Sequence, residues 1–272
     1  MLKFKLGKLP ARRDAKRLWM SKYINRSTIK VDAAPNQNFG TAANAADSAA
    51  WISGLGNYDW GCCFWAAGFR ALLVKLASTG KLTNINSTDA TACVLNAYAA
   101  ATGFNIHASL DANGNNPTDQ GTDALVGMNW LQQNGFVLPD KSVHKIGSYV
   151  WINPQDFEEL VLAHNLFEGL MIGVMFPESW QDADVWDIPK DPVVGGHEIF
   201  GFSDLAIVPE GIKINSWGME RILTVAAIAK NADEIAVSIS PDMFGPNGKS
   251  ITGFDAEQLQ ADEKALAVPS PE

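Results

Sequence analysis

Cysteine is scarce in this 272-residue chain, which contains only Cys62, Cys63 and Cys93. Three thiols cannot all pair and adjacent cysteines rarely bridge each other, so the sequence excludes the disulfide framework of a small secreted protein. We therefore expect a protein of a reducing compartment, with the cytoplasm as its location.

Long apolar runs are absent as well. No run reaches the roughly 18 residues that a membrane-spanning helix needs, and the basic N-terminus lacks the apolar stretch of a secretory signal. With 47% hydrophobic and 19% charged residues, the chain is long enough to bury a sizeable core. We expect a globular protein of one large or two small domains that does not associate with membranes.

Histidine is also rare, and its four positions are scattered. Neither a HExxH pattern nor cysteines at CxxC spacing occur, so the sequence predicts no metal site. Glycine is frequent, but no glycine-rich loop follows a predicted strand. We expect neither a phosphate-binding loop nor a cofactor.

Positive charge is concentrated at the start of the chain. Residues 1–30 contain ten Lys or Arg against one Asp, a local balance of +9, whereas the whole chain carries −9. This asymmetry predicts a basic arm that docks on an acidic surface, either the chain's own body or another protein. Nucleic acid is not predicted as a partner, because one basic arm on an otherwise acidic chain is a weak electrostatic footprint.

Helical patterns precede strand patterns along the chain. Proline-free or capped runs predict helices, apolar runs rich in β-branched residues predict strands, and a stretch rich in Asn, Ala and Gly predicts a connector. The helices are expected at 64–77, 87–101, 123–133, 154–165 and 255–264, the extended segments at 143–151, 170–176, 198–202, 211–215, 222–228 and 234–240, and the connector at 31–55.

The stretch around Cys63 carries the first candidate for chemistry. Cys63 follows Gly61 and opens the proline-free run 64–77, which places its thiol at a helix N-terminus. Unpaired backbone N–H groups and the helix dipole favour a thiolate there, and the thiolate is the nucleophilic form. The alternative is that Cys62 and Cys63 are small buried hydrophobic residues.

A second candidate group lies far along the chain. His197 follows two glycines at the start of an apolar run that predicts a strand, and Asn215 ends another such run, just before Ser216, Trp217 and Gly218. A cysteine, a histidine and an amide, far apart in sequence, are the parts of a nucleophilic triad. Each residue alone fits a turn or the core, and it is their combination that predicts a site.

Together these residues resemble those of papain-like cysteine peptidases. That family has a glycine two positions before the nucleophile, a later histidine on a strand and an Asn-Ser-Trp-Gly element, which Gly61, His197 and residues 215–218 match. The resemblance spans residues 57–218. The chain departs from the family at Asn57, which replaces a glutamine, and at the two residues after Cys63.

The resemblance implies a role for each residue. Cys63 is the nucleophile, His197 takes and returns its proton, and Asn215 accepts the other ring N–H of the histidine. The side-chain amide of Asn57, one methylene shorter than that of glutamine, and the backbone N–H of Cys63 form the oxyanion hole. Gly61 and Trp217 support the site, the latter by covering the bond between Asn215 and His197.

The resemblance also implies an α+β fold of two lobes with a cleft between them. We expect a basic arm and connector at 1–55, a helical lobe at 56–140, a lobe built on an antiparallel β-sheet or barrel at 141–255, and a C-terminal helix and tail at 256–272. Secreted members of the family carry several disulfides and a long inhibitory pro-segment. We expect neither here, because cysteines are few and little chain precedes Cys63.

A narrower resemblance links residues 5–12, 57–63, 195–197 and 253–255 to uncharacterised papain-like proteins of tailed bacteriophages. It implies a protein of the host cytoplasm or of the phage particle, with the particle or an acidic protein as partner of the basic arm. Three functions stay open: a cysteine peptidase acting on a polypeptide, a non-catalytic structural or accessory virion component with the same fold, and another acyl transfer such as peptidoglycan amide cleavage or transglutamination.

Overall fold

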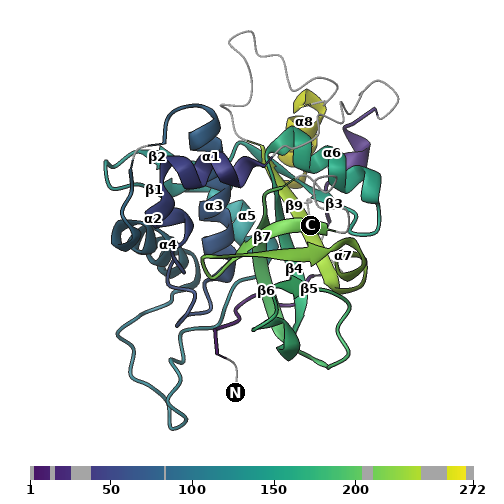
Figure 1. The fold of residues 1–272 in the computed structure, drawn as a ribbon. Coiled ribbons are helices and arrows are strands. Elements are labelled where there is room, and N and C mark those ends of the chain that lie inside the picture. Colours follow the sequence, from purple (N-terminus) through teal and green to yellow (C-terminus); the bar gives the residue numbers. More distant parts are fainter. Residues whose placement is uncertain are drawn as a thin grey trace, which may run out of the picture.

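Helices occupy the first half of the chain and strands dominate the second, as the sequence predicts (Figure 1). The computed structural model describes residues 3–12, 16–25, 38–82, 84–203, 211–239 and 256–267. Its helices are η1 (Met20–Lys22), α1 (Phe39–Ala46), α2 (Ser48–Trp51), α3 (Cys63–Ser78), α4 (Ser87–Thr102), α5 (Ala124–Gln133), α6 (Phe157–Phe167), η2 (Glu178–Trp180), α7 (Val225–Asn231) and α8 (Ala256–Ala267).

The helix α3 lies at the junction of the two halves. Its sequence is rich in Ala and Leu and free of proline, so that helix formation costs little. The helix ends where Gly80 adopts a φ of +67°, which only glycine does readily. Nearly every side chain of α3 is buried, because α1, α4 and α5 pack on one side and strands β4 and β6 on the other.

One seven-stranded sheet forms the second half, in the order β3-β9-β4-β6-β7-β8-β5. Its neighbours pair antiparallel, as predicted, except β5, which pairs parallel with β8 at the edge. The strands, including a separate pair β1–β2, are β1 (Phe136–Val137), β2 (Val143–His144), β3 (Ser148–Ile152), β4 (Leu170–Pro177), β5 (Val185–Trp186), β6 (Val193–Gly201), β7 (Gly211–Ser216), β8 (Met219–Thr224) and β9 (Ala232–Ile239).

Buried apolar side chains form two clusters. One joins α1 to α5 with the facing side of the sheet, and the other lies within the strand-rich half, beneath α6 and α7. Two separate apolar cores are expected for two lobes that pack against each other. The domain limits at 55, 140 and 255 stay a prediction.

The predicted connector is partly wrong. Residues 31–37 lie outside the described residues, but α1 and α2 occupy most of 39–51. Their caps explain the difference: the side chain of Asn38 accepts from the N–H of Thr41 at 3.1 Å, and that of Asp47 accepts from Ala50 at 3.2 Å. A capping side chain satisfies one of the unpaired N–H groups at a helix start, which stabilises even short helices.

The predicted strand 222–228 is also wrong in its second half. Strand β8 stops at Thr224, whose Oγ1 accepts from the N–H of Ala227 at 3.1 Å and caps α7. The apolar run continues through both elements, so that periodicity alone does not separate them. Similarly, α6 begins three residues later than predicted, because Asp156 rather than Asn153 provides its cap.

The basic arm docks on the chain's own acidic side chains. Within the part of the chain that the structure describes, its cations pair with carboxylates far along the sequence. The pairs are Lys3 with Asp182, Lys8 with Asp233 and Glu234, Arg17 with Glu234, and Lys22 with Asp262. This contact favours the chain's own body, the first of the two predicted docking surfaces.

Among the described helices, none is both long and apolar enough to cross a bilayer.

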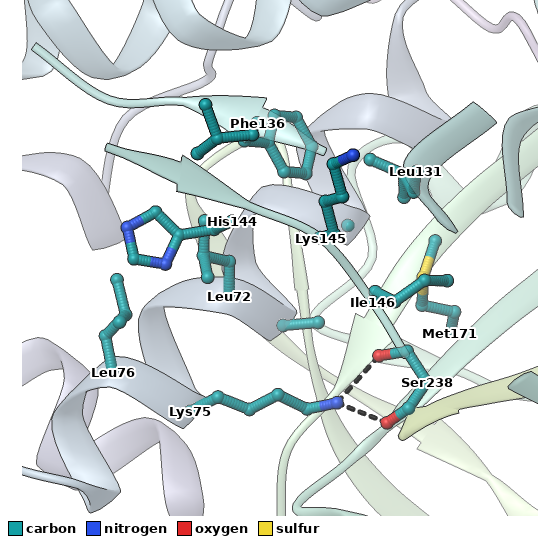
Figure 2. Close-up of a pocket in the computed structure, with 13 residues that line it drawn as sticks. Leu72, Lys75, Leu76, Leu131, Phe136, His144, Lys145, Ile146, Met171 and Ser238 are labelled. Atoms are coloured by element: carbon teal, nitrogen blue, oxygen red, sulfur yellow. Dashed lines mark hydrogen bonds between the residues drawn. The ribbon is translucent and has the colours of Figure 1, made fainter. Parts of the chain in front are cut away.

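One lysine, Lys75, is buried with no carboxylate of the described residues in contact with its Nζ. Lys75 extends from α3 to β9, where its Nζ donates to the carbonyl and the hydroxyl oxygen of Ser238 (Figure 2). The side chain borders a cavity of about 340 Å³, whose apolar lining includes Phe136 and Met171. Burial lowers the pKa of Lys75 to about 8, since the charged form loses its hydration there.

We expect Lys75 to make stability depend on alkaline pH. Between pH 8 and its unfolded value of 10.5, the unfolded chain holds a proton that the folded chain has lost, so that the free energy of unfolding rises with pH. Denaturant unfolding should show the wild type gaining about 2 kcal/mol relative to Lys75→Met between pH 7.5 and pH 10. Lys145→Met, on the exposed rim of the same cavity, serves as the control, and parallel pH curves for wild type and Lys75→Met would contradict the prediction.

Candidate active site at the lobe junction

The turn that leads into α3 is held by a buried hydrogen-bond network. The backbone N–H of Gly61 donates to both carboxylate oxygens of Asp119, at 2.9 and 3.1 Å, and the Tyr98 hydroxyl donates to the same carboxylate at 2.7 Å. Cys62 points away, with its Sγ 3.6 Å from the carbonyl oxygen of Leu55. As a result α3 begins at Cys63, as predicted.

A covering segment, residues 3–9, runs between the two halves and over Cys63. Its main chain binds the helical half at Tyr58 and Thr122 and the sheet at Gly196. The bonds are Lys5 N–H to Tyr58 O (3.3 Å), Thr122 N–H to Gly7 O (2.7 Å), Leu9 N–H to Thr122 O (3.0 Å) and Lys8 N–H to Gly196 O (3.1 Å). The segment is therefore bound as an extended peptide between the lobes.

Glycines allow the covering segment to approach the site closely. A Cβ on Gly7 would lie 1.9 Å from the carbonyl oxygen of Gly61, and a Cβ on Gly196 would lie 2.4 Å from that of Lys8. Gly121, at φ +72°, has the Gly7 carbonyl oxygen 2.2 Å from its ideal Cβ position. No side chain fits at these distances, so glycine on both surfaces is what brings the two backbones together.

Aromatic side chains hold the start of the covering segment. Phe4 stacks on Trp217 with ring centroids 4.9 Å apart and contacts Tyr58 at 5.4 Å. The indole N–H of Trp217 donates to the Lys5 carbonyl oxygen at 3.3 Å, and the Tyr58 hydroxyl donates to the Trp217 carbonyl oxygen at 2.7 Å. A few extended residues therefore suffice to cover the site.

Burial determines the protonation of Cys63. Burial is the largest influence and raises the pKa of the thiol to about 12, while hydrogen bonds from the backbone of Glu198 and of Gly7 lower it in part. The helix start favours a thiolate, as the sequence suggested, but loss of hydration outweighs it here. At neutral pH this pKa keeps Cys63 in its thiol form, which is a weaker nucleophile than the thiolate.

His197 lies on β6, next to the residue whose backbone contacts the Cys63 thiol. Its ring is fully buried, stacks on Trp217 with centroids 4.3 Å apart and planes 16° apart, and joins Ser216 through an Nε2–Oγ hydrogen bond of 2.8 Å. Burial, with a smaller contribution from the Arg70 guanidinium, lowers the pKa of His197 to about 3. Nδ1 has no hydrogen-bond partner among the described residues, so the covered site contains a neutral imidazole not bonded to the thiol.

The structure gives Ser216 a contact that the sequence assigned to its neighbour. We expected Asn215 to hold the His197 ring, but its amide donates to the Trp51 carbonyl oxygen at 2.9 Å. Successive residues of a strand point to opposite faces, so Asn215 faces α2 while Ser216 faces the histidine. The motif Asn-Ser-Trp-Gly contained the signal for Ser216, but sequence alone does not say which of the two residues faces His197.

The Asn57 amide is directed mainly at local backbone. Its Nδ2 donates to the Trp60 carbonyl oxygen at 2.8 Å and approaches the Lys5 carbonyl oxygen at 3.5 Å. Asn57 and Trp217 thus both direct an N–H group at one carbonyl of the bound segment. The described residues contain no cluster of His, Cys, Asp or Glu suited to a metal ion.

Comparisons with known proteins identify the fold. No protein-family model matches the chain, and no curated protein does. Among solved structures, xylellain, a cysteine protease from Xylella fastidiosa, is 15% identical over 88% of this chain and 97% of its own, with a TM-score of 0.60. The cysteine protease and lectin-like domains of Cwp84, a surface layer associated protein of Clostridium difficile, are 14% identical with a TM-score of 0.51, over 88% of this chain and 57% of theirs.

This likeness confirms the predicted α+β, two-lobed, papain-like fold. The phage resemblance stays a prediction, and its last element, residues 253–255, lies outside the described residues. The same holds for the predicted cytoplasmic or virion location.

Loosening the covering segment is expected to expose Cys63. In Lys8→Glu a fourth carboxylate would face Asp233, Glu234 and Glu198 in place of a cation, and the segment should leave the site. Iodoacetamide should then modify Cys63 at least about tenfold faster at pH 7.5, which corresponds to roughly 1.4 kcal/mol. The measurement is peptide mapping by mass spectrometry, which separates Cys63 from Cys62.

Lys3→Glu provides the matched control, because Lys3 pairs with Asp182 on the exposed surface. A labelling rate of Cys63 that is the same in wild type, Lys3→Glu and Lys8→Glu would contradict the covering role.

Proposed function

We propose that the protein is a cysteine peptidase in which Cys63 attacks a peptide carbonyl and His197 carries the proton. The observation that supports it is the covering segment itself. An extended polypeptide lies across Cys63 and is held by main-chain hydrogen bonds at Gly196 and Thr122, which are independent of side-chain identity. A groove that binds peptide backbone beside a thiol is suited to peptide-bond chemistry.

The proposed reaction begins when the segment leaves and water enters. Hydration would bring the pKa of Cys63 down and that of His197 up, since burial is the largest cause of both shifts. The thiol proton then passes to Nδ1, the nitrogen without a hydrogen-bond partner in the described part of the site. Ser216 holds Nε2 and with it the ring orientation.

The thiolate adds to the substrate carbonyl carbon, and the tetrahedral intermediate collapses with cleavage of the C–N bond. The imidazolium gives its proton to the leaving amine, and a water deprotonated by His197 then hydrolyses the thioester to a carboxylic acid. Asn57 and Trp217 direct N–H groups at the Lys5 carbonyl oxygen of the bound segment, and in this proposal they would stabilise negative charge on the oxygen of the substrate carbonyl. One such donor is typically worth about 3 kcal/mol of barrier.

A non-catalytic protein with the same fold is the second candidate. It is favoured by one observation, the absence of a hydrogen bond between Nδ1 of His197 and any described residue, the Cys63 thiol included. In that case the segment would be a permanent part of the structure rather than a cover.

We expect peptide hydrolysis from Lys8→Glu that depends on Cys63 and His197. Incubation with casein should release new α-amino groups, and adding Cys63→Ser or His197→Ala to Lys8→Glu should lower the rate by at least about 10³-fold. His107→Ala, an exposed histidine, is the control. Iodoacetamide labelling of Cys63 that is slow and indifferent to His197→Ala would instead support the non-catalytic protein.

A further inference from the structure

A pocket of carboxylates lies beside the Cys63 thiol. Glu198 contributes to it from β6, and Asp233 and Glu234 contribute from β9. The side chain of Lys8 fills this pocket and is completely buried, with its Nζ 2.8 Å from Asp233 Oδ2 and 2.9 Å from Glu234 Oε1. A cation removed from water in this way requires paired anions, and the pocket provides them.

The floor of the pocket is shaped for a long side chain. Gly173 of β4 pairs with Glu198 in the sheet, and a Cβ at this position would lie 2.2 Å from Lys8 Cε and 2.9 Å from Cδ. Any other residue there would close the space that the lysine methylenes occupy. The pocket therefore combines a space over Gly173, which the lysine methylenes occupy, with an acidic end.

Among the described residues, the arm does not use every hydrogen-bond acceptor of the pocket. Lys8 and Arg17 face three carboxyl groups, and Glu198 Oε2 is buried without a hydrogen-bond partner among the described residues. Burial and the neighbouring Glu234 raise the pKa of Glu198 well above its ordinary range. Glu198 Oε2 can therefore accept one more hydrogen bond than Lys8 provides. A guanidinium, which has five N–H donors against the three of an ammonium, is suited to donate it.

We propose that this pocket, formed by Glu198, Asp233 and Glu234 over Gly173, selects a lysine or arginine side chain of the substrate. Lys8 occupies it as a stand-in from the same chain. Because the backbone of Gly7 contacts the Cys63 thiol, the selected side chain belongs to the residue next to the one that meets the sulfur. This assignment rests on the proposed function, because only a peptidase has a substrate side chain for the pocket to select.

Binding is the first test, because it does not require catalysis. A fluorescent peptide with the sequence of residues 3–12 is titrated into Lys8→Glu and followed by anisotropy, beside the same peptide with norleucine at the Lys8 position. The lysine peptide should bind about tenfold or more tightly than the norleucine peptide, since its charge is paired in the pocket. Adding Glu234→Gln should reduce this ratio to below about threefold.

Two further variants control for a general loss of negative charge and for a failure to fold. Asp182→Asn removes an acidic residue that pairs with the arm on the exposed surface and should leave the ratio unchanged. Lys8→Met serves as the milder background should Lys8→Glu fail to fold, with folding checked by circular dichroism. Equal binding of the two peptides in a folded chain overturns the proposal.

Hydrolysis is the second test and separates the two proposals. Peptides with Lys, Arg, norleucine or Glu at each position around one cleavable bond are compared by kcat/KM in Lys8→Glu. A preference of about tenfold or more for Lys and Arg at one position, lost in Glu234→Gln, is the expected result. Cleavage without a preference for Lys or Arg would overturn the proposed role of the pocket and support the peptidase. Lysine-selective binding without cleavage would overturn the peptidase and support a pocket that binds basic peptides.

Discussion

The ion pairs of Lys8 determine the state of the whole site. A buried ammonium is tolerated only beside anions, and Asp233 and Glu234 on β9 lie within 3 Å of it. Because Lys8 is held there, the preceding residues lie between the lobes, and the backbone of Gly7 contacts the Cys63 thiol. Burial raises the pKa of the Cys63 thiol and lowers that of the His197 imidazole.

The two pKa shifts oppose reactivity together. A nucleophilic cysteine works as a thiolate beside an imidazolium, and the covered state favours the neutral form of both groups. Water in the site would reverse both shifts, since burial is the largest cause in each case. Cys63 and His197 are therefore both uncharged in the covered state, and under the proposed function access of solvent would charge them.

Local features of the site were predictable from the sequence, and relative placements were not. Cys63 at a helix start follows from Gly61 and the proline-free run behind it. The apolar run after His197 predicted the strand there, although β6 begins earlier, at Val193. By contrast, the contact of Ser216 rather than Asn215 with His197 depends on how β7 pairs with β6. A shift of one residue would exchange the two side chains, and composition does not fix that register.

The binding site of the covering segment was likewise not predictable from the sequence, because it depends on residues far apart in the chain. The charge count of residues 1–30 predicted an acidic docking surface, but Asp233 and Glu234 lie more than 200 positions from Lys8. Only the folded sheet places them beside Glu198. The caps of α1 and α7 were missed for a simpler reason, since Asn38 and Thr224 have the residue types of ordinary turns and become caps only through the backbone that follows.

The close contact of Gly7 with Gly61 affects how readily the Cys63 sulfur is oxidised. Oxidants such as peroxide attack the thiolate and need access to it, and the first product is a sulfenic acid. With glycine backbone packed over it and its proton retained, the Cys63 sulfur is shielded from that damage. A chain stored in this form would keep its sulfur reduced through an oxidative episode and become vulnerable only once it opens.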